Sequence, residues 1–215
     1  MYQYNENNYC SPEEIQRIIA AVLHISKHAE RNALLIEVGW ETGGRISEVL
    51  TLVPEHVMEK SIVLVNLKQR KLKSGKPPNK IVEVSPELCA WIRKYCDKNN
   101  IQKGDWVFPA ERSKVKHLDR SLVFDMITAA SESAGVYRMG KDNIRSGSRY
   151  KGISYHVLRH SYATHLLRKG NKMAVVQAQL GHSNIGSTQQ YASIVIDDVR
   201  ATVAAARVNL YHPEG

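Results

Sequence analysis

The stretch His156-Val-Leu-Arg159-His-Ser-Tyr-Ala-Thr-His165-Leu-Leu combines an apolar stripe with a pair of basic side chains. Three apolar residues recur at every fourth position, which predicts a helix over about 155–169 with one face toward a core. These residues are Leu158, Tyr162 and Leu166. His156 and Arg159 stand three positions apart, so both side chains lie on one face of the same helix. The His-x-x-Arg spacing alone is weak evidence for a site, because it occurs four times in the chain.

Two further motifs make the copy at His156 and Arg159 more specific than the other three copies of this spacing. Downstream, Gln179-Leu-Gly-His182 follows Arg159 by 23 residues, and Tyr191 follows the histidine by nine. The glycine before this histidine is typical of a helix end. Upstream, Thr42-Gly-Gly-Arg45-Ile-Ser-Glu48 places an arginine at a glycine-rich helix start, where backbone N–H groups favour phosphate. Together these motifs form one set.

Most of the chain has the periodicity of helices. Ser11-Pro-Glu-Glu14 has the pattern of a capping box with proline in the first turn, and it predicts a helix over 11–25. Gly43-Gly44 is expected to end a second helix that begins near Arg31. Further helices are expected over 46–53, 87–96, 119–134, 172–180, 187–192 and 197–207.

Strands are expected in the middle of the chain. Residues 61–67 are β-branched and apolar, and 80–84 alternate, which predicts two paired strands. Trp106-Val-Phe108 is predicted to be a short strand. Two connections, 68–79 and 138–151, are rich in Lys and Arg. The predicted fold class is therefore mainly α with a small antiparallel β-sheet (α+β), in one domain.

Composition sets limits on function. The chain has 215 residues and a formal net charge of +9, an excess that favours polyanions as partners. Its longest apolar run, Ile18 to Leu23, is far too short to span a membrane. The three cysteines form no CxxC pair, which argues against a disulfide framework or a zinc site. We therefore expect reduced thiols, no bound metal and a cytoplasmic location.

With these motifs in order, the chain resembles the tyrosine recombinases, also called phage-type integrases. The first box of that family is similar to Gly43-Gly-Arg45-Ile-Ser-Glu48, and the second is similar to the stretch that begins at His156. The third is similar to Leu180-Gly-His182, with Tyr191 nine residues on. The resemblance spans the chain from Ser11 to beyond Tyr191 and implies the tyrosine recombinase catalytic-domain fold.

The resemblance implies an enzyme that cleaves and rejoins duplex DNA. Tyr191 would be the nucleophile and form a 3′-phosphotyrosyl bond that conserves the phosphodiester energy, so that no metal, ATP or other cofactor is required. Two arginines suit the stabilisation of the phosphate in the transition state, and the candidates are Arg45 and Arg159. His156 would assist proton transfer, and His182 would hydrogen-bond the phosphate.

A lysine in the turn between the two predicted strands would protonate the leaving 5′-oxygen. Lys73, in Lys73-Ser-Gly-Lys76-Pro, fits the family pattern best and is our choice. Lys68 and Lys76 stay open as alternatives. Alignment from the Arg45 side favours Lys68, and alignment from the strand that begins at Lys80 favours Lys76.

Other residues receive supporting roles. Glu48 is expected to hold Arg45 in place. Basic residues of the two connections are expected to contact DNA, and they are Lys68, Arg70, Lys71, Lys76, Lys80, Arg145 and Arg149. Residues assigned to packing or structure are Tyr162, His160, His165, Cys89 and Cys96.

The expected organisation is a short extension over 1–10, a catalytic domain over 11–196 and a tail helix over 197–215. The apolar tail is expected to pack on a neighbouring protomer, with packing on its own domain as the alternative. The N-terminal core-binding domain of most family members is expected to be absent from this chain. The chain is therefore expected to be either a catalytic fragment or a compact single-domain member.

The leading function is site-specific recombination by integration, excision, inversion or resolution. Expected partners are duplex DNA with specific sites, further copies of the chain in a tetrameric synapse, and accessory DNA-bending proteins, with no membrane involved. One alternative is a type IB topoisomerase or a telomere resolvase, which would use a related pocket. Another is a DNA-binding module without catalysis. Every residue type of the pocket is present in the sequence, which favours an enzyme.

Overall fold

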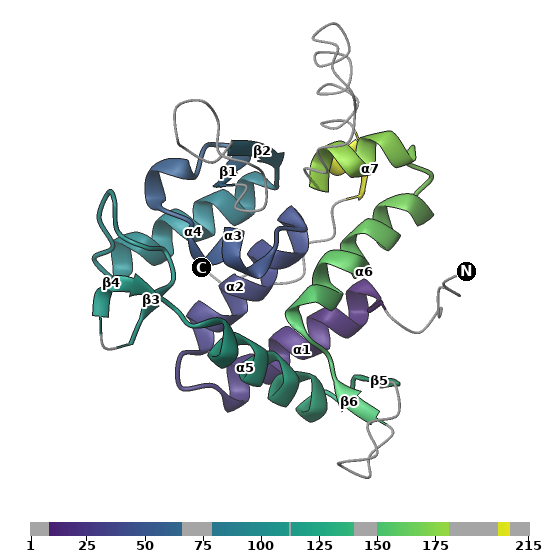
Figure 1. Ribbon diagram of the computed structural model, residues 1–215, viewed down its shortest axis with the longest axis horizontal. Coiled ribbons are helices and arrows are strands. Elements are labelled where there is room, and N and C mark those ends of the chain that lie inside the picture. The colour runs from purple at the N-terminus through teal and green to yellow at the C-terminus, as the bar shows by residue number, and fades with distance from the viewer. Residues whose placement is uncertain (1–8, 66–78, 112, 140–149, 181–201, 207–215) are drawn as a thin grey trace, which may run out of the picture.

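The computed structural model describes residues 9–65, 79–111, 113–139, 150–180 and 202–206 (Figure 1). The helices are α1 (Pro12–Ile25), α2 (Ala29–Thr42), α3 (Ile46–Leu50), α4 (Pro86–Lys98), α5 (Arg120–Ser133), α6 (Tyr155–Arg168) and α7 (Met173–Leu180), with a short 3-10 helix over Pro54–His56. The strands are β1 (Ser61–Val65), β2 (Asn79–Glu83), β3 (Pro109–Ala110), β4 (Ser113–His117), β5 (Tyr137–Met139) and β6 (Tyr150–Gly152). Three antiparallel strand pairs therefore surround a helical body, and the mainly α fold is confirmed.

Helix α1 begins as the sequence predicts. The Ser11 hydroxyl accepts a hydrogen bond from the Glu14 N–H, and the Glu14 carboxylate accepts one from the Ser11 N–H, so the capping box is complete. Four aliphatic side chains at helical spacing are buried on one face, and they are Ile15, Ile18, Ile19 and Val22. The helix packs on α2 and α5.

Helix α2 is the central element of the body. Helices α1, α4 and α6 all pack against it, and nearly all of its side chains are buried (Figure 1). It ends at Gly43, which has the left-handed φ of 54° and terminates the helix as predicted. Helix α3 begins at Ile46, and Arg45 is the residue just before it. The buried helix α2 therefore fixes the position of the Arg45 backbone.

Strands β1 and β2 pair antiparallel, with Leu64 opposite Lys80. Side chains alternate along β2: Val82 is buried, whereas its neighbour Ile81 is 63% exposed. This alternation places Lys80 on the same inward face as Val82. The paired strands predicted over 61–67 and 80–84 are confirmed for their described residues.

The predicted strand over Trp106-Val-Phe108 is wrong. Val107 and Phe108 are fully buried, and the Val107 N–H donates to the Leu52 carbonyl, but strand pairing begins only at Pro109. The run is apolar because Val107 and Phe108 are buried in the core, and none of its residues is paired in a strand. Strands β3 to β6 were not predicted, because they are short and carry polar or charged residues such as those of Ser113–His117.

Four of the residues assigned to packing or structure have packed side chains, and they are Tyr162, His165, Cys89 and Cys96. Tyr162 lies in the core against Trp40, and the His165 ring also contacts Trp40. Cys89 and Cys96 are buried free thiols, as is Cys10. In the part of the chain that the structure describes, no helix combines the length and the apolar character needed to cross a membrane.

The described part of the tail, 202–206, is helical and contacts its own chain. Val203 packs against Val175 of α7, and the His165 imidazole is hydrogen-bonded to the Ala206 carbonyl at 2.9 Å. These contacts correspond to the alternative in which the tail packs on its own domain. Packing on a neighbouring protomer stays a prediction, and the helix expected over 187–192 lies outside the described residues.

Candidate active site

The turn between α2 and α3 is held tightly against two other helices. A Cβ atom on Gly43 would lie 2.5 Å from Leu180 Cδ2 and 2.9 Å from Tyr162 Cδ1. Because the φ of this residue is also positive, only glycine fits here without strain. The backbone before Arg45 is therefore fixed against α6 and α7.

Arg45 and Glu48 form the first part of the site. The Arg45 guanidinium pairs with Glu48 Oε1 at 2.8 Å, and the Arg45 N–H donates to Glu48 Oε2 at 3.1 Å. The Glu48 side chain is 1% exposed, whereas that of Arg45 is 26% exposed. A buried carboxylate thus orients an arginine that still reaches the surface, which is the arrangement expected of Glu48.

Arg159 joins this turn to the end of α7. Its guanidinium donates one hydrogen bond to the Gly43 carbonyl and another, at 3.1 Å, to the Leu180 carbonyl. Arg159 is buried on α6, one turn from its N-terminus. Arg159 therefore brings α6 and the end of α7 into contact with the turn before Arg45, which lies more than 100 residues away in the sequence.

Lys80 belongs to the same group, in contrast to the exposed DNA contact that its place in a basic run suggests. Its ammonium lies 3.1 Å from Glu48 Oε2 and donates to the Leu180 carbonyl at 3.2 Å. Only 9% of the side chain is exposed. The alternation of β2 explains this, because Lys80, Val82 and Val84 share the inward face. The same alternation in the sequence could have indicated the burial of Lys80.

Burial and pairing oppose each other at Glu48. Burial raises the pKa of its carboxyl, but the charge of Lys80 and hydrogen bonds from Arg45 and Lys80 outweigh burial and leave the pKa below its usual value. Burial lowers the pKa of Lys80, with Glu48 opposing. Burial and the nearby charge of Arg45 lower the pKa of Arg159 to about 10. Glu48 and Arg159 are therefore both charged at neutral pH.

His156 lies at the exposed first turn of α6, three residues before Arg159. The helix thus turns the arginine inward to the Gly43 turn and leaves the histidine at the surface beside it. The spacing predicts two side chains on one face of the helix, and in the structure Arg159 is buried whereas His156 is exposed.

The other predicted site residues lie outside the described residues. These are the candidate catalytic residues Lys73, His182 and Tyr191, and the candidate DNA contacts Lys68, Arg70, Lys71, Lys76, Arg145 and Arg149. Leu180, whose carbonyl binds both Arg159 and Lys80, stands two positions before His182. The assembled group therefore reaches the start of the third motif.

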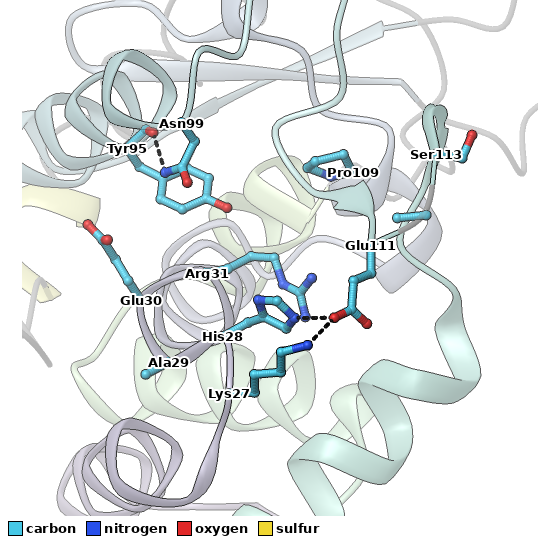
Figure 2. A pocket seen from close by; sticks show the side chains of 11 residues that line it. Lys27, His28, Ala29, Glu30, Arg31, Tyr95, Asn99, Pro109, Glu111 and Ser113 are labelled. Carbon is cyan, nitrogen blue, oxygen red and sulfur yellow. Dashed lines mark hydrogen bonds and ion pairs between the residues drawn. The ribbon is translucent and has the colours of Figure 1, made fainter.

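A separate cavity of about 660 Å³ opens at the other end of α2 (Figure 2). In it, Lys27 and His28 point toward Glu111, with distances of 2.6 and 3.1 Å to Oε1. Hydrogen bonds from these two residues, chiefly Lys27, lower the pKa of Glu111 to about 2. Among the predicted site residues that the structure describes, none lines this cavity.

Comparison with known proteins identifies what this chain is similar to. Residues 8–195 match the model of the phage integrase family. Tyrosine recombinase XerD of Yersinia pestis is 31% identical over 176 residues, covering 79% of this chain and 52% of that protein. Tyrosine recombinase XerA of Thermococcus onnurineus (strain NA1) is 25% identical over 198 residues, covering 91% of this chain and 61% of that protein. The chain thus spans between half and two thirds of the length of these relatives.

Solved structures agree in fold. The site-specific recombinase XerH, in a pre-cleavage complex with its difH substrate, superposes with a TM-score of 0.63 at 21% identity. The match covers 88% of this chain and 50% of that one. At this identity the likeness establishes the fold, and it agrees with the helical body and small antiparallel sheets described above.

Proposed function

The chain belongs to the phage integrase family, and on that premise we propose that it is a site-specific tyrosine recombinase that cleaves and rejoins duplex DNA. The observation that carries the proposal is the meeting of Arg45 and Arg159 at the Gly43 turn. Both guanidinium groups are oriented by hydrogen bonds before any DNA arrives. Such preorganised cations stabilise developing phosphate charge most effectively, because they do not have to reorganise during the reaction.

Tyr191 supplies the nucleophile in this proposal. Its phenolic oxygen attacks the phosphorus, a 3′-phosphotyrosyl bond forms, and the bond to the 5′-oxygen breaks. The phenol loses a proton, with His156 assisting, and the departing 5′-oxygen gains one from Lys73, with Lys68 and Lys76 as the alternatives. His182 hydrogen-bonds the phosphate. Attack by a free 5′-hydroxyl on the phosphotyrosine reverses these steps and rejoins the strand.

Charge and surroundings support DNA as the substrate. The chain carries nine surplus positive charges, and Arg45 and His156 both reach the surface next to the buried Arg159. The basic connections 68–79 and 138–151 supply further cations for the phosphate backbone. The similar XerH structure contains its difH substrate. We extend the proposal to several copies of the chain on one DNA substrate, as a recombination synapse requires.

The test is covalent capture from a pool of nicked duplexes with a randomised centre. A nick beside the cleavage position releases a short strand, so the phosphotyrosyl adduct accumulates and survives denaturation. Wild-type chain should enrich one sequence family, and Tyr191→Phe should form no adduct on it. Tyr137→Phe is the matched control, because Tyr137 is an exposed tyrosine outside the three motifs, and it should behave as wild type.

Two results would contradict the proposal. Adduct formation that survives Tyr191→Phe would remove Tyr191 as nucleophile. Relaxation of supercoiled plasmids that lack the enriched sequence, at the same rate as plasmids that carry it, would favour a topoisomerase over a site-specific recombinase.

A further inference from the structure

Lys80 has two binding partners, and each belongs to a different motif of the site. Glu48 Oε2, at 3.1 Å, belongs to the carboxylate that also binds the Arg45 guanidinium and N–H. The Leu180 carbonyl, at 3.2 Å, is the last of α7 and also accepts from Arg159. One ammonium group therefore touches the partners of both arginines.

The contact with Leu180 has its own physical reason. The last carbonyl groups of a helix have no partner within the helix and lie at the negative end of its dipole. Lys80 and Arg159 both donate to the Leu180 carbonyl, so two cations bind this end of α7. The Gln179 amide adds a bond at 2.8 Å to the Glu83 carbonyl of β2, which holds the same helix end on the same strand.

A lysine at this place needs an explanation beyond packing. Val82 on the inward face of β2 and Val84 just after the strand are apolar and buried, and burying an ammonium costs free energy unless it is paired. Arg45, Lys80 and Arg159 already place three cations around the single carboxylate of Glu48. Charge balance within this group of four would be better without Lys80, so neutralising Glu48 does not account for it.

We propose that Lys80 is a positioning residue of the recombination site: it holds Glu48 against Arg45 and fixes the C-terminal end of α7 at Leu180. Lys80 acts through these groups and does not itself touch the reacting phosphate. The inference rests on the proposed function, because it assigns a role within that site. Through Lys80, β2 is linked to Arg45 by way of Glu48, and it directly contacts Leu180 at the start of the third motif.

The first experiment separates rate from binding. The full chain is compared with Lys80→Met, Lys80→Arg and Lys116→Met, a matched control on the exposed face of β4. The probe is the nicked duplex enriched by covalent capture. Lys80→Met should slow adduct formation by about 100-fold, the loss that a displacement of about 1 Å can cause, while DNA affinity changes by less than about threefold. Lys80→Arg, which can donate to both partners, should recover most of the rate.

A double variant distinguishes positioning from charge balance. Lys80→Met combined with Glu48→Gln removes one positive and one negative charge, so the group of Arg45, Arg159 and residues 48 and 80 keeps the net charge that it has in the wild type. The rate of adduct formation in this double variant should stay low, because neither Arg45 nor Leu180 regains its contact. If the double variant recovered the wild-type rate, Lys80 would be a counter-ion only and the proposal would be overturned. A wild-type rate in Lys80→Met would overturn it as well.

A measurement without DNA keeps this test independent of the proposed function. The Nε–Hε resonances of Arg45 and Arg159 report the surroundings of both guanidinium groups in ¹H–¹⁵N spectra. Both should move in Lys80→Met, return close to their wild-type positions in Lys80→Arg, and stay in place in Lys116→Met. Unmoved resonances in Lys80→Met would overturn the positioning role. Failure of the wild-type chain to form any adduct would instead count against the recombinase proposal and leave this readout valid.

Discussion

Each end of α2 places one carboxylate between two basic side chains, but the surroundings of the two carboxylates differ. Beyond its C-terminal end, Glu48 lies between Arg45 and Lys80, and the Glu48 side chain is 1% exposed. Just before its N-terminal end, Lys27 and His28 flank Glu111, which is 53% exposed. Water can replace any partner at the exposed end, whereas a charge left alone at the buried end has no substitute. Both carboxylates have two basic partners, so the number of ion pairs does not distinguish them. Burial does, and only the buried carboxylate can hold its partners in fixed positions.

The largest expected effect comes from removing each carboxylate charge in turn. Glu48→Gln leaves three cations without their common partner and should lower the free energy of unfolding by about 3–5 kcal/mol. Glu111→Gln, the matched change at the exposed end, should cause a clearly smaller loss, because water replaces its partners there. Urea titrations of both variants at pH 7 measure the difference. Equal losses at the two ends would show that burial does not separate them.

A second test concerns the Gly43 turn, which lies between α2 and Arg45 and accepts a hydrogen bond from Arg159. Gly43→Ala must place a Cβ at positive φ and against Leu180, so we expect a loss of about 2–4 kcal/mol from strain and overpacking combined. Gly135 also has positive φ, but an added Cβ would meet nothing within 4 Å, and Gly135→Ala should cost only about 1 kcal/mol. Chemical denaturation resolves the two values. A smaller loss for Gly43→Ala than for Gly135→Ala would mean that the turn is not tightly held.

Sequence reasoning recovers the buried end of α2 better than the exposed one. Periodicity predicts the helices, and Gly43-Gly44 predicts where α2 stops, because these signals are local. The pairing of Arg45 with Glu48 follows from a spacing of three residues. The pair of Lys27 with Glu111 joins residues 84 positions apart and leaves no pattern in the sequence.

The errors have physical causes as well. The basic run 68–80 predicts that Lys80 contacts DNA, whereas the alternation along β2 turns its side chain inward. Trp106-Val-Phe108 reads as a strand, yet its apolar side chains fill the core next to Leu52 without a ladder. Contacts such as that of Arg159 with the Gly43 carbonyl depend on how α6 crosses α2, which the sequence encodes only through the whole packing of the domain.

The smallest effect, and the most selective one, is the response of the two carboxyl groups to salt. At Glu111 the low pKa comes from exposed ion pairs, and raising the salt concentration from about 0.1 M to about 1 M shortens the screening length from about 10 Å to about 3 Å. Its pKa should therefore rise from about 2 toward the usual value, whereas the pKa of Glu48, shielded from solvent, should change less. Carboxyl ¹³C titrations at both salt concentrations measure this, and a larger salt response at Glu48 would contradict the comparison.

The same pKa values fix the direction of the pH dependence. Since the pKa of Glu48 is lower in the folded than in the unfolded chain, its contribution to stability is present above the usual value of 4.5 and is lost as the pH falls through the folded-state pKa. The stability difference between wild type and Glu48→Gln should thus be full at pH 7 and shrink below about pH 4.5, at low and high salt alike. A difference that persisted undiminished at low pH would mean that the Glu48 side chain acts through its shape and hydrogen bonds, and that its charge is not what distinguishes the buried end of α2.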